Sequence, residues 1–395
     1  MNRGLNTLIG AQFLSAFGDN AILFTVIALT LEQGGRGNWY IPALQSAFIV
    51  AFILLTPWVG RLADRQPKPR VLLGANLIKA LGAFAIAFGV EPLVGYAVIG
   101  IGAASYGPAK YGIIPDLSTQ DQLVRANGWV EGATIAAILT GTVGGARLAD
   151  HSIPMALGLV IALYFTSGIA TLFLPRGPVK LLEGEDSAWG ELLVSMKALG
   201  SHQKTCLILI ALSLFWSIAA TLRVVLVAWV PEVLHAETAS AIANLTFFMA
   251  IGIVIGAAIV PRLIPLNRVR RARFAAYLMG ILFILMGYVT QTLQAEVLLL
   301  GIGIFGGMIV VPLNASVQEI GHHSIGSGRA VAAQNFFQNS AILLGMGLYS
   351  VSAAEGISAV QTILFLGGLV VVSTFILSRF LPKRKEPMPI TPPPV

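Results

Sequence analysis

Residues 8–31 read LIGAQFLSAFGDNAILFTVIALTL, an apolar run broken near its centre by an acid and an amide. A helix needs about 20 residues to cross the roughly 30 Å hydrocarbon layer of a membrane, so this run is long enough to span it. Asp19 and Asn20 stand where the core of a cleaved signal peptide would be uniformly apolar. We therefore expect the run to be retained as a membrane helix.

Eleven further apolar runs of similar length follow along the chain. Hydrophobic residues make up 56% of the 395 residues and charged residues 11%, against about 25% charged in an ordinary soluble domain. This composition excludes a soluble globular enzyme and predicts an all-α membrane protein with twelve transmembrane helices. The runs lie near residues 8–31, 42–60, 71–89, 93–114, 126–148, 154–174, 205–230, 240–260, 274–292, 295–318, 328–352 and 359–380.

The sequence lacks the common signatures of enzymes and cofactor sites. Its five histidines form no His-Glu-x-x-His pattern, and it contains neither a phosphate-binding P-loop nor a Gly-x-Ser-x-Gly elbow. Cys206 is the only cysteine, so it forms neither an internal disulfide nor a metal-binding spacing. We expect no enzymatic activity, no cofactor and no metal.

Basic residues predict the orientation of the chain. Lys and Arg gather in the loops after even-numbered runs, whereas the loops after odd-numbered runs carry mostly acids. Cytoplasmic loops collect Lys and Arg, so both termini and residues 175–204 are expected in the cytoplasm. The net charge of +7 then reflects topology and attraction to anionic membrane lipids, and no nucleic-acid partner is expected. The proline-rich residues 382–395 are expected to be a disordered tail.

The two halves of the chain match at an interval of 204 residues. A duplication predicts two six-helix bundles, residues 1–174 and 205–381, joined by a cytoplasmic linker over 175–204, with a binding site at mid-membrane. The alternative is coincidence within a low-complexity apolar sequence. The matching pairs are Pro57 and Pro261, Pro108 and Pro312, Arg125 and Arg329, and Gly141 and Gly345.

Five charged residues fall within or near the predicted spans: Asp19, Lys79, Lys110, Glu131 and Arg223. Each costs about 2.5 to 3.5 kcal/mol at a helix centre, so pairing, hydration or a function is needed to retain it. The alternative to function is an ion pair that stabilises packing or, for the two lysines, snorkelling to the cytoplasmic surface. The set has one surplus positive charge, which we expect to attract an anionic group such as a phosphate.

A shift of 204 residues aligns Asp19 with Arg223. Opposite charges therefore occupy equivalent positions in the two halves. We expect these side chains to face each other across the substrate path. Asn20 adds an oxygen ligand for a sodium ion, although two residues do not make a site. Four amides of the eleventh run either line the path or bond to neighbouring helices: Gln334, Asn335, Gln338 and Asn339.

The loop after the second run, Gly60–Arg65 (GRLADR), resembles a conserved loop motif of the major facilitator superfamily. In that motif the aspartate meets a helix N-terminus and basic residues, forming a latch that opens as the bundles rock. Pro67 replaces the second glycine of the motif, and a solvated basic loop is the alternative. The predicted gating residues are Asp64, Arg65, Arg70 and Arg125.

Several strings resemble the bacterial lysophospholipid transporters of this superfamily. They are Ala11–Asn20 (AQFLSAFGDN), Pro108–Gly112 (PAKYG), Ala126–Gly128 with Glu131, Leu214–Trp216 with Thr221–Arg223, and Val311–Asn314 with Ala333–Asn335. The resemblance implies a major facilitator fold in a Gram-negative inner membrane. It also implies inward movement of lysophosphatidylethanolamine and related lysolipids by alternating access, followed by reacylation by an acyl-acyl-carrier-protein synthetase. Asp19, Arg223 and Lys110 match the family's expected headgroup or gating residues.

Charge and chemistry agree with a lysolipid substrate, which carries a phosphate, often an amine, and one acyl chain. We expect Arg223 and Lys110 to attract the phosphate, while Asp19 pairs with Arg223 in the empty state or takes the ammonium group. The alternatives are a proton-coupled exporter of amphipathic drugs or metabolites, with Asp19 or Glu131 carrying the proton, an intramembrane lipid-modifying enzyme, and a membrane scaffold. The driving ion, the headgroup preference and the oligomeric state stay open.

Overall fold

Every predicted apolar run coincides with a helix in the computed structural model. The structure describes residues 3–34, 37, 39–118, 123–175, 188–201, 203–264, 270–323 and 327–380. The helices of the first half are α1 (Arg3–Gln33), α2 (Tyr40–Arg65), α3 (Lys68–Ala87), α4 (Pro92–Leu117), α5 (Leu123–His151) and α6 (Ile153–Thr171). Those of the second half are α8 (Gln203–Leu234), α9 (Ala239–Leu263), α10 (Ala272–Met286), α11 (Thr292–His323), α12 (Ser327–Ala354) and α13 (Ala359–Phe380).

Nine of the described helices are long and apolar enough to cross a membrane: α1, α2, α3, α5, α6, α8, α9, α11 and α13. α10 is apolar but has 15 residues. For α4, α10 and α12 the crossing of the membrane stays a prediction. Helix starts follow local chemistry: Pro92 begins α4 after Glu91, and the Ser152 hydroxyl accepts a hydrogen bond from the backbone N–H of Met155 at the start of α6.

One further helix of the described residues, α7 (Ala188–Gly200), lies inside the stretch expected to be a plain linker. Residues 176–187 of this stretch and the predicted tail, 382–395, lie outside the described residues. Trp189 of α7 makes an edge-to-face contact with Phe336 of α12, at 6.2 Å between ring centroids. This aromatic contact attaches α7 to the helices that follow it in sequence.

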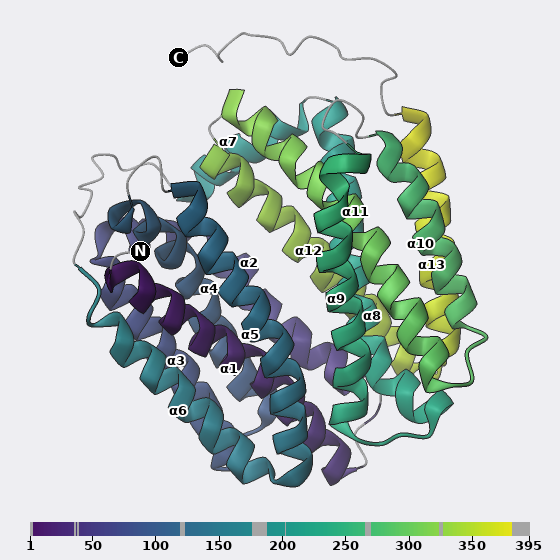
Figure 1. The fold of residues 1–395 in the computed structure, drawn as a ribbon, viewed down its shortest axis with the longest axis horizontal. Coiled ribbons are helices and arrows are strands. Elements are labelled where there is room, and N and C mark those ends of the chain that lie inside the picture. The colour runs from purple at the N-terminus through teal and green to yellow at the C-terminus, as the bar shows by residue number, and fades with distance from the viewer. Residues whose placement is uncertain are drawn as a thin grey trace. The chain divides into compact units, whose positions relative to one another are not determined.

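The chain divides into two compact units. Unit 1 comprises residues 1–36, 43–188 and 237–243, and unit 2 comprises residues 37–42, 189–236 and 244–395. Within unit 1, α1 packs on α5 and α6, and α3 packs on α4 and α6 (Figure 1). Within unit 2, α8 packs on α12 and α13, and α10 packs on α11 and α13. A shift of 204 residues converts each of the first four contacts into one of the second four.

Close helix contacts repeat in the same register. A Cβ atom added to Gly141 of α5 would lie 2.7 Å from the carbonyl oxygen of Phe17 in α1. The equivalent Gly345 of α12 packs on Ser217 and Thr221 of α8, and Thr221 lies 204 residues after Phe17. Small residues at such crossings let membrane helices approach closely. The packing of each unit is therefore consistent with one structural repeat used twice.

Candidate functional site

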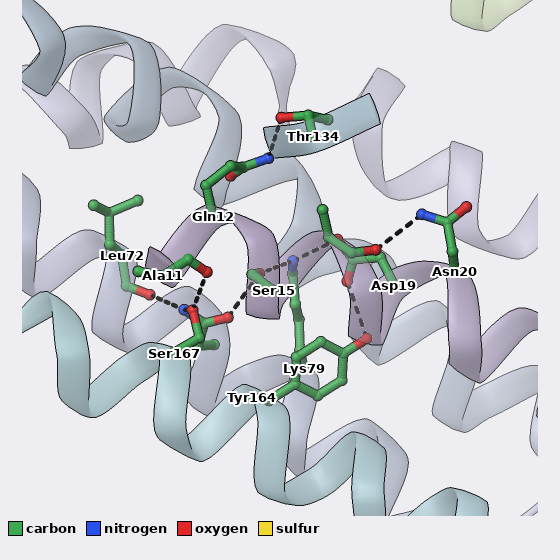
Figure 2. Close-up of polar contacts among 12 residues, drawn as sticks. Ala11, Gln12, Ser15, Asp19, Asn20, Leu72, Lys79, Thr134, Tyr164 and Ser167 are labelled. Carbon is green, nitrogen blue, oxygen red and sulfur yellow. Dashed lines mark hydrogen bonds and ion pairs between the residues drawn. The ribbon is translucent and has the colours of Figure 1, made fainter. Parts of the chain in front are cut away.

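An ion pair with a buried lysine joins α1 and α3 in unit 1. The Lys79 ammonium on α3 is 2.7 Å from the Asp19 carboxylate on α1 and donates a 2.9 Å hydrogen bond to the Ser15 hydroxyl (Figure 2). Tyr164 of α6 donates a 3.0 Å hydrogen bond to the second oxygen of Asp19. The Lys79 side chain is 1% exposed, whereas that of Asp19 is 25% exposed. The acid is thus the accessible member of the pair.

Aromatic rings complete the surroundings of the lysine. The Lys79 ammonium lies 4.8 Å from the ring centroid of Tyr106 on α4 and 5.5 Å from that of Tyr164. An ammonium over an aromatic face gains electrostatic stabilisation, most strongly where water is excluded. Two tyrosines, a serine and a carboxylate together offset the desolvation of this buried charge.

A hydrogen-bonded chain extends from the ion pair toward α6. Ser15 donates to the Asn76 side-chain oxygen at 2.9 Å, and the Asn76 amide donates to Ser167 at 3.1 Å (Figure 2). Ser167 in turn donates to the backbone carbonyl of Ala11 at 2.7 Å. The chain joins α1, α3 and α6, so it stabilises the positions of the helices that carry Asp19 and Lys79.

A second ion pair in unit 1 has the same asymmetry of exposure. Lys110 of α4 lies 3.7 Å from Glu131 of α5, and Tyr111 donates a 2.6 Å hydrogen bond to the same carboxylate oxygen. The Lys110 ammonium also lies 4.0 Å from the Tyr111 ring centroid. The Lys110 side chain is 8% exposed and that of Glu131 46%. Again the carboxylate is accessible and the ammonium is covered.

The structure describes the surroundings of several of the predicted intramembrane charges. The alternative explanation that Lys79 snorkels to the membrane surface is wrong, because its side chain is buried against Asp19. Arg223 lies half-buried on α8 in unit 2. That its side chain faces Asp19 across the substrate path stays a prediction. Asn20 donates a 2.9 Å hydrogen bond from its amide nitrogen to the carbonyl of Ala16 in its own helix, and its role as an oxygen ligand for sodium stays a prediction.

The amides of α12 separate into different environments. Gln334 donates a 2.7 Å hydrogen bond to Asn314 of α11, which supports interhelical bonding. Asn335 is exposed, and Asn339 is half-buried. The Gln334 oxygen and the Gln338 nitrogen are buried and have no hydrogen-bond partner among the described residues.

The predicted gate is only partly described. Arg65 and Arg70 are exposed at the end of α2 and the start of α3, whereas the side chains of Asp64 and Arg125 lie outside the described residues. In the same region, Lys68 at the start of α3 forms a 2.8 Å ion pair with Asp116 at the end of α4. Asp116 was missed by the sequence reasoning because it lies at the end of an apolar run.

Sequence reasoning also missed Asn76, Tyr111, Tyr164 and Ser167. A usable signal existed, since Asn76 and Lys79, like Tyr164 and Ser167, are polar residues three apart in otherwise apolar runs and so share a helix face. Among the described residues, no three His, Cys, Asp or Glu side chains gather as a metal site requires.

Residues 8–346 match the family model of the Major Facilitator Superfamily. This chain belongs to the Major Facilitator Superfamily. The predicted all-α transporter fold of this superfamily is thereby confirmed, as is the resemblance on which it partly depended.

Curated relatives within the family carry one functional name. The chain is 43% identical over 363 residues to the lysophospholipid transporter LplT of Enterobacter sp. (strain 638), covering 91% of both chains. It is 42% identical over 394 residues to the protein of the same name from Photorhabdus laumondii, covering 96% of this chain and 97% of that protein.

Solved structures of other transporters share the fold at lower identity. The nucleoside transporter NupG is 20% identical with a TM-score of 0.73, covering 97% of this chain and 100% of NupG. A bacterial homologue of the human lysosomal transporter Spinster, solved inward-facing and unoccupied, is 13% identical with a TM-score of 0.74 and covers 98% and 100% of the two chains. These likenesses concern the fold alone.

Proposed function

We propose that this chain moves lysophospholipids, lysophosphatidylethanolamine among them, across the bacterial inner membrane to the cytoplasmic leaflet by alternating access. The observation that carries the proposal is the pairing of Lys79 with Asp19 in a chain more than 40% identical to lysophospholipid transporters. Such a pair keeps opposite charges together inside an apolar bundle, where isolated charges are costly.

The difference in exposure within each ion pair supports an assignment of the charged groups of the substrate to particular side chains. In both pairs the carboxylate is accessible and the lysine is covered. We assign the substrate's ammonium group to Asp19 or Glu131, since a cation meets the acid before it meets the lysine. The covered position of Lys110 makes it less suited to the phosphate than the sequence alone implied, so we assign the phosphate to Arg223.

Substrate binding would exchange one set of ion contacts for another. As the ammonium group approaches Asp19, the carboxylate keeps a positive partner throughout, and Lys79 keeps Ser15 and the two tyrosine rings. This exchange limits the desolvation penalty that a bare buried charge would incur. We further propose that the delivered lysolipid is reacylated by an acyl-acyl-carrier-protein synthetase at the cytoplasmic face.

Uptake of labelled lysophosphatidylethanolamine by proteoliposomes tests the proposal. Wild-type protein should take up the lipid and leave it chemically unchanged, and ion gradients imposed one at a time identify the driving force. Arg223→Gln, which removes the charge assigned to the phosphate, should abolish uptake. Wild-type protein that moves no lysophospholipid under any gradient would overturn the proposed function.

A further inference from the structure

A groove in unit 1 lies between the end of α2 and the first half of α3, and Ser105 of α4 also lines it. Its volume is about 240 Å³, several times the roughly 30 Å³ that one water molecule occupies in the liquid. A Cβ atom added to Gly74, a lining residue of α3, would meet no neighbouring atom within 4 Å. The space beside this stretch of α3 is therefore open.

The groove follows a face of α3 that points away from the polar interior of unit 1. Arg70, Gly74, Leu77 and Leu81 are spaced i, i+4, i+7 and i+11, so they share one face of the helix. Leu77 and Leu81 are 43% and 62% exposed on a helix that is apolar enough to cross a membrane. The buried Lys79 follows Arg70 by nine residues, which at about 100° per residue places it on the opposite face. The groove therefore borders the acyl chains of the surrounding lipid.

The groove is polar at one end and mainly apolar along the rest. Gln66 and Arg70 line the polar end, next to the loop between α2 and α3, and both are exposed. From Arg70 to Ile78 the lining residues of α3 extend over about 12 Å, at 1.5 Å per residue. The Ser105 hydroxyl already donates a 2.9 Å hydrogen bond to the Ile101 carbonyl of its own helix. A ligand that fits this pattern has a polar headgroup and an apolar chain.

The polar end favours a negatively charged headgroup. Among the described residues, Arg70 forms no ion pair, whereas nearby Lys68 is paired with Asp116 at 2.8 Å. No Asp or Glu side chain lines the groove in the part of the chain that the structure describes. A guanidinium binds a phosphate through paired, charge-assisted hydrogen bonds. The groove thus offers a partner to a phosphate and none to an ammonium group, unlike the accessible carboxylates of Asp19 and Glu131.

We propose that this groove binds an anionic phospholipid of the surrounding membrane, with its phosphate at Arg70 and one acyl chain along α3 as far as Ile78. The lipid is a resident of the bilayer and not the transported substrate, because the groove has no acidic partner for the ammonium group of a zwitterionic lysolipid. The basic loop between α2 and α3 is expected in the cytoplasm. The lipid would therefore belong to the cytoplasmic leaflet, whose anionic headgroups attract basic residues at the ends of membrane helices.

Binding of phosphatidylglycerol to purified, delipidated protein in a neutral detergent tests the site. Native mass spectrometry counts the bound lipids, and a titration gives the dissociation constant. Arg70→Gln removes the charge, and Gly74→Leu fills the groove without altering the charge. The matched controls are Arg379→Gln, at an exposed arginine near the end of α13, and Gly158→Leu, at an exposed glycine of α6 with no neighbouring atom within 4 Å.

We expect Arg70→Gln to weaken phosphatidylglycerol binding roughly tenfold, the effect of one lost charged hydrogen bond. Gly74→Leu should weaken it to a similar extent, because the new side chain occupies the space of the acyl chain. Both controls should bind as the wild type does, and the melting temperature without lipid shows whether each variant is folded. Wild-type affinity in Arg70→Gln would overturn the headgroup site. Wild-type affinity in Gly74→Leu would reduce the binding to surface charge and overturn the groove.

Photolabelling of the wild-type protein tests the site without any substitution. Phosphatidylglycerol with a photoreactive diazirine in one acyl chain should label Val71 or Ile78, and excess unlabelled phosphatidylglycerol should remove the label. Labels confined to exposed apolar residues elsewhere would indicate ordinary boundary lipid and overturn the site. Equal competition by lysophosphatidylethanolamine would place the groove on the transport path and overturn the resident lipid. Each of these measurements reports binding, so its result is independent of whether the chain transports lysophospholipids.

Discussion

Lys79 and Asp19 are joined across α1 and α3 by a 2.7 Å ion pair in which the lysine is covered and the acid is accessible. The difference in exposure determines which of the two charges an entering group meets first. A cationic group that enters from the accessible side meets the carboxylate first, while the positive charge behind it stays neutralised.

Asp19→Asn should destabilise the protein as well as stop transport. The substitution leaves the Lys79 ammonium buried without its carboxylate, and breaking a buried pair costs roughly 3 to 5 kcal/mol. We expect the lower end, because a quarter of the Asp19 side chain is exposed. Thermal unfolding in detergent measures this loss. The double variant Asp19→Asn with Lys79→Met should regain stability but not uptake; a double variant as unstable as the single one would contradict a pairing role for Lys79.

Removal of the accessible carboxylates should alter headgroup preference. Glu131→Gln keeps the size of the side chain and removes the charge assigned to an ammonium group. Uptake of lysophosphatidylethanolamine should therefore fall by roughly tenfold, the effect of a lost charged hydrogen bond. Lysophosphatidylglycerol, which has no ammonium, should be affected less. Equal losses for both lipids would argue that Glu131 acts only through Lys110.

Ser167→Ala should weaken the junction of α1, α3 and α6 without removing a charge. The hydroxyl accepts from Asn76 and donates to the Ala11 carbonyl, so its loss removes two hydrogen bonds, while Asn76 keeps its bond to the Leu72 carbonyl. An intramolecular hydrogen bond contributes about 0.5 to 1.5 kcal/mol to stability. Ser201→Ala, at an exposed serine after α7, is the matched control. Similar melting temperatures for the two variants would show that the chain of hydrogen bonds adds little stability.

Gly141→Val should disrupt the crossing of α1 and α5. An added Cβ would lie 2.7 Å from the Phe17 carbonyl oxygen, and backbone on both sides leaves little room to adjust. Overpacking of this kind costs about 1 to 3 kcal/mol. Gly158→Val in α6, where no neighbouring atom lies within 4 Å, supplies the same substitution in open space. The melting temperature should fall in Gly141→Val and stay near the wild-type value in Gly158→Val.

The helices could be predicted from sequence because their determinants are local. Each apolar run is long enough to bury its own backbone hydrogen bonds in a hydrocarbon layer, so length and composition suffice. α7 escaped prediction because its residues belong to no long apolar run. The 204-residue repeat was also visible in sequence, through matches such as Gly141 with Gly345.

Partners of the buried charges could be predicted only in part. The sequence identified Asp19, Lys79, Lys110 and Glu131 as costly residues that need a partner. It aligned Asp19 with Arg223 through the repeat but could not show that Lys79 reaches the same carboxylate within unit 1. Helical spacing places side chains on faces of one helix and leaves the rotation of that helix against its neighbours undetermined.

By itself the sequence determined a family, a set of membrane helices and an inventory of charges, because hydrophobic length and residue type act along the chain. Tertiary structure alone decided that Lys79 is covered and Asp19 accessible, and that Lys110 and Glu131 form a second pair with the same difference in exposure. The physical reason is that exposure and pairing depend on which helix faces meet. Which faces meet is determined by the packing of several helices together, so it cannot be inferred from one run of sequence.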